Sequence, residues 1–126
     1  MMRKDYILRY FDELAKVLAV VLQLKNDLKP KEAESKINDF ANSHLEIDLD
    51  KIATIKPEDI VNYLLTEKNF TLDHFKLLED LLYHKYLLNK SNENLKNCTL
   101  EVFNYLTKVD KDYSFNRINR TRELGH

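Results

Sequence analysis

The spacing of apolar residues predicts helices along most of the chain. In residues 5–24, apolar side chains recur three or four positions apart, which is the period of an amphipathic helix. One face of this segment collects Ile7, Phe11, Leu14, Leu18, Val21 and Leu22. The apolar arc is wide, and a wide arc is typical of a helix that contacts more than one neighbour.

A second helix is expected to begin at Pro30, because proline is favoured at the first helical position. Its narrower apolar face consists of Ala33, Ile37, Phe40, Ala41 and Leu45. Only a few residues connect it to the first helix, so we expect the two to pack antiparallel as a hairpin.

Residues 46–56 alternate between apolar and polar side chains, which taken alone favours a strand. No second strand pattern is present to pair with it, so we interpret this segment as a linker with apolar anchors, with room for a short helical turn. A third, short helix is then expected from Pro57, where Glu58 and Asp59 suit the positive end of the helix dipole.

The helix expected at about residues 71–90, with Thr71 as its N-cap, is apolar around most of its circumference. One face carries Leu72, Phe75, Leu78, Leu82 and Tyr86, and a second carries Leu77, Leu81 and Leu88. A helix of this kind is usually surrounded by others. We therefore expect it to be the central, buried helix.

Ser91 or Asn92 is expected to cap a fifth helix that ends near Val109. A weaker sixth helix is expected over 114–124, with Phe115 and Ile118 facing inward and Leu124 as a further candidate. Residues 122–126 are expected to form a frayed tail. The sequence thus predicts one all-α domain over 1–126, with five or six helices in antiparallel hairpins.

Two segments resemble the second helix of a tetratricopeptide repeat. Ala33, Ile37 and Phe40 have the small, aliphatic and aromatic spacing of that helix, and Thr99, Phe103 and Leu106 repeat it 66 residues later. That offset is about twice the repeat length of 34. The middle copy would place Thr66, Phe70 and Asp73 at these positions, and there the period fails.

The opening RKDYILRYFDELAKVLAVVLQLKND is also similar to the start of a small bacterial family of tetratricopeptide-like proteins of unknown function. The likeness extends to Arg3, Asp5, Tyr6, Ile7, Glu32, Ala33 and Leu49, and to the two helices after Thr71. This resemblance implies a right-handed stack of helical hairpins. It brings no activity and no functional residue with it.

Composition excludes several classes of site. The one glycine is Gly125, whereas phosphate-binding loops and dinucleotide fingerprints need several. Cys98 is the one cysteine, so neither an intrachain disulfide nor a multi-cysteine zinc site can form. Asp12, Glu13 and Lys16 interrupt the first apolar segment, so we expect no signal peptide, no membrane span and a cytoplasmic protein.

The histidines give weak candidates for chemistry. His74 and His84 are ten residues apart on one helix, which is too far for one metal ion. Asp80 and His84 supply two ligands where a site needs three or four. His44 suits a helix C-terminus. No motif supports Cys98 as a nucleophile, so we expect no enzyme, no metal and no cofactor.

The C-terminal segment is basic and has a candidate anion-binding face. Residues 81–126 carry a net charge of +3, and 46–80 carry −5. Arg117, Arg120 and Arg122 are three of the five arginines, and the first two lie one turn apart, which suits a shared phosphate or carboxylate. The simpler interpretation is a solvated last helix.

Two functions therefore follow from the sequence. The favoured one is a protein-binding module, which recognises a protein partner or a second copy of itself through stacked helical hairpins. The alternative is a small regulatory or nucleic-acid-associated domain that uses the basic last helix, although three arginines are few for nucleic acid. No small-molecule substrate is indicated.

Overall fold

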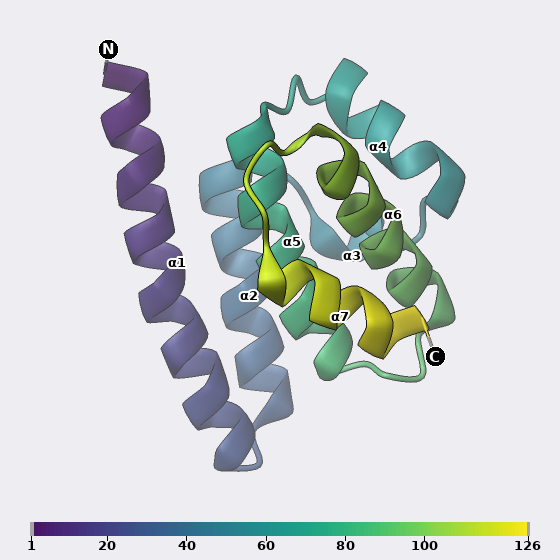
Figure 1. The fold of residues 1–126 in the computed structure, drawn as a ribbon. Coiled ribbons are helices and arrows are strands. Elements are labelled where there is room, and N and C mark those ends of the chain that lie inside the picture. The colour runs from purple at the N-terminus through teal and green to yellow at the C-terminus, as the bar shows by residue number, and fades with distance from the viewer. Residues whose placement is uncertain (1, 126) are drawn as a thin grey trace. The chain divides into compact units, whose positions relative to one another are not determined.

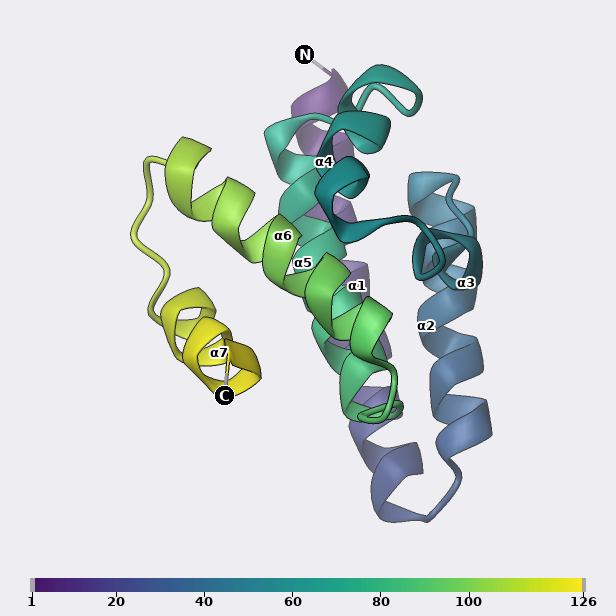
Figure 2. The same ribbon diagram turned by 90° about the vertical axis from the view of Figure 1, so that its right-hand side faces the viewer.

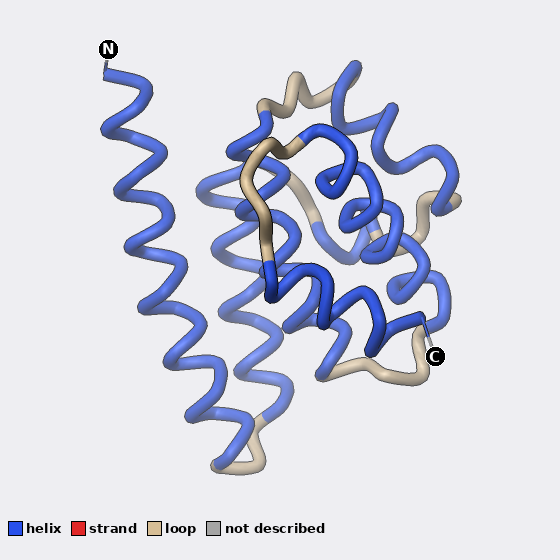
Figure 3. The backbone as a smooth tube through the Cα atoms, viewed as in Figure 1, coloured by secondary structure: helices blue, strands red, loops and turns tan. Residues whose placement is uncertain are grey.

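The computed structural model describes residues 2–125, and every regular element among them is a helix (Figure 3). The all-α prediction is confirmed. The described residues contain seven helices rather than five or six: α1 (Met2–Asn26), α2 (Pro30–Leu45), α3 (Leu49–Ile52), α4 (Pro57–Thr66), α5 (Leu72–Leu87), α6 (Glu93–Val109) and α7 (Phe115–Gly125). The additional helix is α3, a single turn within the predicted linker.

Contacts along the chain define two compact units, Met1–Asp50 and Lys51–His126. The boundary falls inside the predicted linker 46–56. Four linker side chains are nevertheless buried, namely Ile47, Leu49, Ile52 and Ala53. The linker is thus anchored by apolar residues and contains no strand, as predicted. A single domain over 1–126 stays a prediction.

The first unit contains the antiparallel hairpin of α1 and α2 (Figure 1). The predicted apolar face of α2 is confirmed, because Ala33, Ile37 and Ala41 are fully buried and Phe40 and Leu45 nearly so. Among the α1 side chains that the structure describes, Leu14 and Val21 are buried, each with 2% of its surface exposed, whereas Leu22 is 48% exposed. The contact with α2 therefore covers only part of the wide apolar arc of α1.

Helix ends in this glycine-poor chain use other residues in the left-handed conformation. Leu28, Glu46 and Asn69 have φ values of 61°, 56° and 53°. After α1, the amide of Leu28 donates to the carbonyl of Lys25 and that of Lys29 donates to Leu24. This is the bonding of a Schellman motif, which satisfies the last carbonyls of the helix.

In the second unit, α6 lies against α4, α5 and α7 (Figures 1 and 2). The residues Leu95, Cys98, Thr99, Val102, Phe103 and Leu106 of α6 are all fully buried. Both predicted faces of α5 contain buried residues, namely Phe75, Leu77, Leu78, Leu81 and Leu82, each at 0% exposure, but Leu72, expected on the first face, is 38% exposed. Because α6 also lies against three helices of this unit, the central position expected for α5 stays a prediction.

The predicted caps explain where α5 and α6 begin. Thr71 Oγ1 accepts from the amide of His74, and the amide of Thr71 donates to His74 Nδ1 over 3.0 Å. This capping box uses histidine where glutamate is usual. Asn92 caps α6 by accepting from the amide of Leu95 at 3.0 Å, which decides between the two predicted caps.

The last helix differs from the prediction in two ways. It extends to Gly125, and Leu124 is 2% exposed, so the tail expected at 122–126 is helical as far as residue 125. Residue 126 lies outside the described residues. Phe115, expected to face inward, is 65% exposed, whereas Arg117 is buried. Residues two apart lie about 200° apart around a helix, so burial of Arg117 turns Phe115 outward.

Replacement of Leu78 tests the burial of α5. Leu78→Ala is expected to lower the free energy of unfolding by about 2–5 kcal/mol, because it removes buried methyl groups and leaves a cavity. Leu72→Ala is the control on the same helix, since Leu72 is 38% exposed, and we expect a loss below about 1 kcal/mol. Urea unfolding followed by circular dichroism measures both, and equal losses would contradict the burial described.

Candidate functional site

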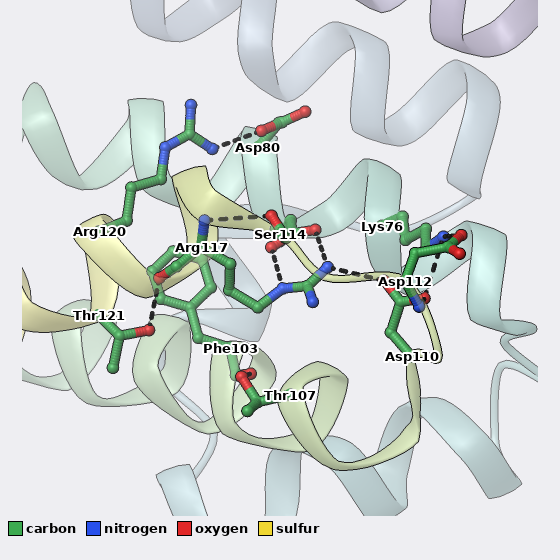
Figure 4. A network of polar contacts seen from close by, with 11 residues as sticks. Lys76, Asp80, Phe103, Thr107, Asp110, Asp112, Ser114, Arg117, Arg120 and Thr121 are labelled. Carbon is green, nitrogen blue, oxygen red and sulfur yellow. Dashed lines mark hydrogen bonds and ion pairs between the residues drawn. The ribbon is translucent and has the colours of Figure 1, made fainter.

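Arg117 is the centre of a buried ionic network between α7, α5 and the loop after α6 (Figure 4). Its Nε and Nη2 atoms each donate to one carboxylate oxygen of Glu79 over 2.8 Å, which is a bidentate pair. The two side chains are 4% and 10% exposed. The hydrogen bond from Arg117 to Glu79 raises the pKa of the guanidinium, against the opposing effect of burial.

Asp110 holds the other side of the network. It accepts from Arg117 Nη2 at 3.3 Å and lies 3.3 Å from Lys76 Nζ. The amide of Asp112 also donates to it over 3.1 Å. Burial favours a higher pKa for this carboxyl group, but the bonds from Asp112, Lys76 and Arg117 outweigh burial and lower the pKa.

Arg120 is also paired with α5. Its Nη1 lies 2.5 Å from Asp80 Oδ1, and its guanidinium stands 4.2 Å from the centre of the Tyr83 ring. The Tyr83 hydroxyl in turn donates to both carboxylate oxygens of Glu123, over 2.9 and 3.0 Å. Burial and this bond to Glu123 raise the pKa of Tyr83. Polar contacts thus attach α7 to α5 along two helical turns.

These contacts change the interpretation of the three predicted arginines. Arg117 and Arg120 lie on one helix, as predicted. Each is paired with a carboxylate of the same chain, Arg117 with Glu79 and Arg120 with Asp80. Arg122 remains exposed at the surface. The sequence did not indicate this pairing, because it depends on two consecutive acids of α5 that lie about forty residues away.

A shallow hollow of about 400 Å³ lies over the ionic network. It is lined by Lys76, Glu79, Asp110, Asp112, Tyr113, Ser114, Phe115, Asn116 and Arg117. Tyr113 and Phe115 at its edge are 76% and 65% exposed. Its charged groups are paired with one another, so the hollow shows no charge reserved for a ligand.

The first unit carries an exposed apolar surface on α1. Leu8 and Leu22 are 58% and 48% exposed, and Ala15 and Ala19 between them are exposed as well. Leu8, Ala15 and Leu22 are seven residues apart and Ala19 is four beyond Ala15, so all four share one face of the helix. We call these four residues the α1 stripe. It adjoins the seam of Leu14 and Val21 against α2.

His44 joins the two helices of the hairpin. Its Nε2 lies 2.5 Å from Glu13 Oε2 on α1, and its ring stacks on Phe40 with the centres 4.0 Å apart. Ser43 Oγ lies 2.7 Å from His44 Nδ1. The serine, histidine and glutamate are linked through the imidazole, as in a hydrolytic triad, but the two ring nitrogens are exchanged: the serine lies at Nδ1 and the carboxylate at Nε2. The last turn of α2 presents carbonyl groups, however, which would not stabilise an oxyanion.

Cys98, the sequence candidate for a nucleophile, is buried and unreactive. Burial, with a contribution from Glu101, raises the pKa of Cys98 to about 11, so little reactive thiolate is present at neutral pH. Cys98 Sγ donates to the carbonyl of Ile55 over 3.4 Å. Among the described residues, no three histidine, cysteine or acidic side chains gather as metal ligands, and no helix is both long and apolar enough to cross a membrane.

Breaking the central ion pair is expected to be strongly destabilising. Arg117→Met should lower the free energy of unfolding by about 3–5 kcal/mol, because the Glu79 carboxylate is left buried without its partner. The double variant Arg117→Met with Glu79→Met should lose less, because no buried charge is stranded. Arg122→Met on the same helix is the control, with a change within about 0.5 kcal/mol. Equal losses in the single and double variants would contradict the pairing.

The network also predicts a pH dependence of stability. A carboxyl group whose pKa is lowered by folding stabilises the fold above its unfolded pKa of about 3.9, and this contribution is lost as the pH falls through the folded pKa. Asp110→Asn should therefore lose less stability than the wild type between neutral and acidic pH. Urea unfolding across this range measures the slopes, and identical slopes would be inconsistent with the assignment.

Comparison of the chain with protein-family models, with curated proteins and with solved structures gives no significant match.

Proposed function

We propose that this chain is a helical protein-interaction module that binds another protein chain through the α1 stripe. The single observation that carries the proposal is the exposure of Leu8 and Leu22 beside the buried seam of the hairpin. Two leucines aligned with two alanines make a continuous apolar strip. Such a strip, bordered by polar residues, is typical of a protein-binding surface.

The energy available from this strip is modest but useful for binding. Full burial of an exposed leucine stabilises by about 1.5–3 kcal/mol. Leu8 and Leu22 are about half exposed, so each would contribute roughly half of that on binding a partner. Ala15 and Ala19 add little area themselves but allow a partner to approach closely between the two leucines.

We further propose that the hairpins form a tetratricopeptide-like stack, which is an architecture that serves protein binding. The burial of both repeat-like segments supports this proposal. Ala33, Ile37 and Phe40 are at most 3% exposed, and Thr99, Phe103 and Leu106 are fully buried. The same spacing thus selects the inward face of both α2 and α6.

The alternative use of the basic end receives less support. Arg117 and Arg120 would have to leave Glu79 and Asp80 before they could bind a phosphate. Arg122 alone offers a single contact, and nucleic-acid affinity depends on several. We therefore retain a protein partner, in a cytoplasmic setting, as the proposal.

The test compares substitutions on two sides of α1. Leu8→Glu with Leu22→Glu should abolish binding of a partner chain, because two charges enter the apolar strip. The free energy of unfolding, measured at low micromolar protein, should change by no more than about 0.5 kcal/mol per site, as for surface residues. Val20→Glu is the matched control, since Val20 is 45% exposed on the other side of the helix.

A different result would assign the stripe to internal packing. If the double variant lost more than about 2 kcal/mol at a protein concentration where dilution has no further effect, the leucines would be part of the folded core. The proposed interaction surface would then be wrong, whatever the oligomeric state of the chain.

A further inference from the structure

We infer that the partner of the α1 stripe is a second copy of this chain, with the two α1 helices antiparallel and Ala15 at the two-fold axis. This inference rests on the proposed function and adds the identity and the geometry of the partner. It follows from the symmetry of the stripe, from the small residues at its middle and from the charges at its edge.

The stripe is symmetric about Ala15. Leu8 lies seven residues before it and Leu22 seven residues after it, and both are exposed. In a two-fold interface every contact occurs twice. If residue i of one copy contacts residue j of the other, then residue j of the first copy contacts residue i of the second. An antiparallel pair centred on Ala15 therefore places each Leu8 opposite Leu22 of the other copy, so both leucines of each copy are covered.

The middle of the stripe permits the close approach that this arrangement needs. Ala15 and Ala19 are the smallest exposed side chains of the strip, and they lie at and beside the proposed axis. Packed helices lie about 8–10 Å apart, and the shorter distances require small side chains at the crossing. The leucines then pack on either side of the crossing point.

The polar edge of the stripe is complementary to itself in this orientation. Asp12 and Lys16 are both exposed on the side of the stripe away from α2. Antiparallel pairing brings this edge of one copy against the same edge of the other. Asp12 then lies opposite position 18 of its partner, two residues from Lys16, which is about 3 Å along the axis. A lysine side chain spans that offset, so two Asp12–Lys16 pairs form between the copies.

A parallel pair lacks this match. There, the Asp12 edge of one helix would face the opposite edge of the other helix, where Leu14 and Val21 are already buried against α2. The antiparallel arrangement also sets the two helix dipoles in opposite directions, which is the favourable orientation. Charge and burial therefore both select the antiparallel pair.

Single cysteines at the stripe test this geometry. Ala15→Cys should crosslink to itself under mild oxidation, because a two-fold axis brings its two Cα atoms within the roughly 7 Å that a disulfide allows. Leu8→Cys alone and Leu22→Cys alone should crosslink poorly, whereas a mixture of the two should crosslink well. Native Cys98 is fully buried and serves as an internal non-reacting thiol.

Val20→Cys, on the other side of α1, is the matched control for random collision. We expect Ala15→Cys to form dimer on a non-reducing gel about tenfold faster than Val20→Cys, because a specific pair raises the effective concentration of the thiols. Analytical ultracentrifugation of the wild type over a dilution series should show a dimer that dissociates, and Leu8→Glu with Leu22→Glu should be monomeric.

Each other outcome overturns the inference. Efficient crosslinking of Leu8→Cys with itself would indicate a parallel pair. Equal rates for Ala15→Cys and Val20→Cys, together with a wild type that is monomeric at all concentrations, would exclude a second copy as the partner. If the glutamate variants nevertheless keep full stability, the interaction surface itself survives, and its partner is a different protein.

Discussion

The pairing of Arg117 with Glu79 is the interaction on which the arrangement of the second unit depends. A buried guanidinium needs acceptors for its N–H groups and a compensating negative charge, and Glu79 of α5 supplies both through two 2.8 Å bonds. This requirement fixes the rotation of α7, because Arg117 must face inward. Phe115 then faces outward, and Leu124, seven residues after Arg117, is buried on the same side. One ion pair thus decides which face of the last helix is covered.

The same pairing determines what the basic end of the chain offers to other molecules. A cluster of arginines indicates an anion site only when no carboxylate of the same chain reaches it. Glu79 and Asp80 are consecutive on α5, and they meet Arg117 and Arg120, which are one turn apart on α7. The positive charge of residues 81–126 is therefore partly used inside the fold, because Arg117 and Arg120 are paired with carboxylates of the same chain.

Local signals in the sequence predicted much of the fold. Pro30, Pro57 and Thr71 mark helix starts. Apolar residues three or four positions apart identify the buried faces of α2, α5 and α6. These features depend on residues within one helical turn of each other, so they can be predicted from the local order of residue types along the chain. The inward turn of Arg117 and the contact of His44 with Glu13 were not predictable, because each depends on a partner more than thirty residues away.

The two units differ in which residues lie in an unfavourable environment: the second unit buries charged groups, and the first exposes leucines. In the second unit, charged groups that must be buried find partners, and in the described residues no buried side-chain nitrogen or oxygen lacks a hydrogen bond. In the first unit, α1 packs on α2 through Leu14 and Val21, and Leu8 and Leu22, on another face of α1, stay at the surface. This exposed apolar surface is the reason why we propose α1 as the binding element. We base the proposed pairing on the equal spacing of the exposed leucines about Ala15, because a two-fold rotation at that alanine sets Leu8 of one copy opposite Leu22 of the other.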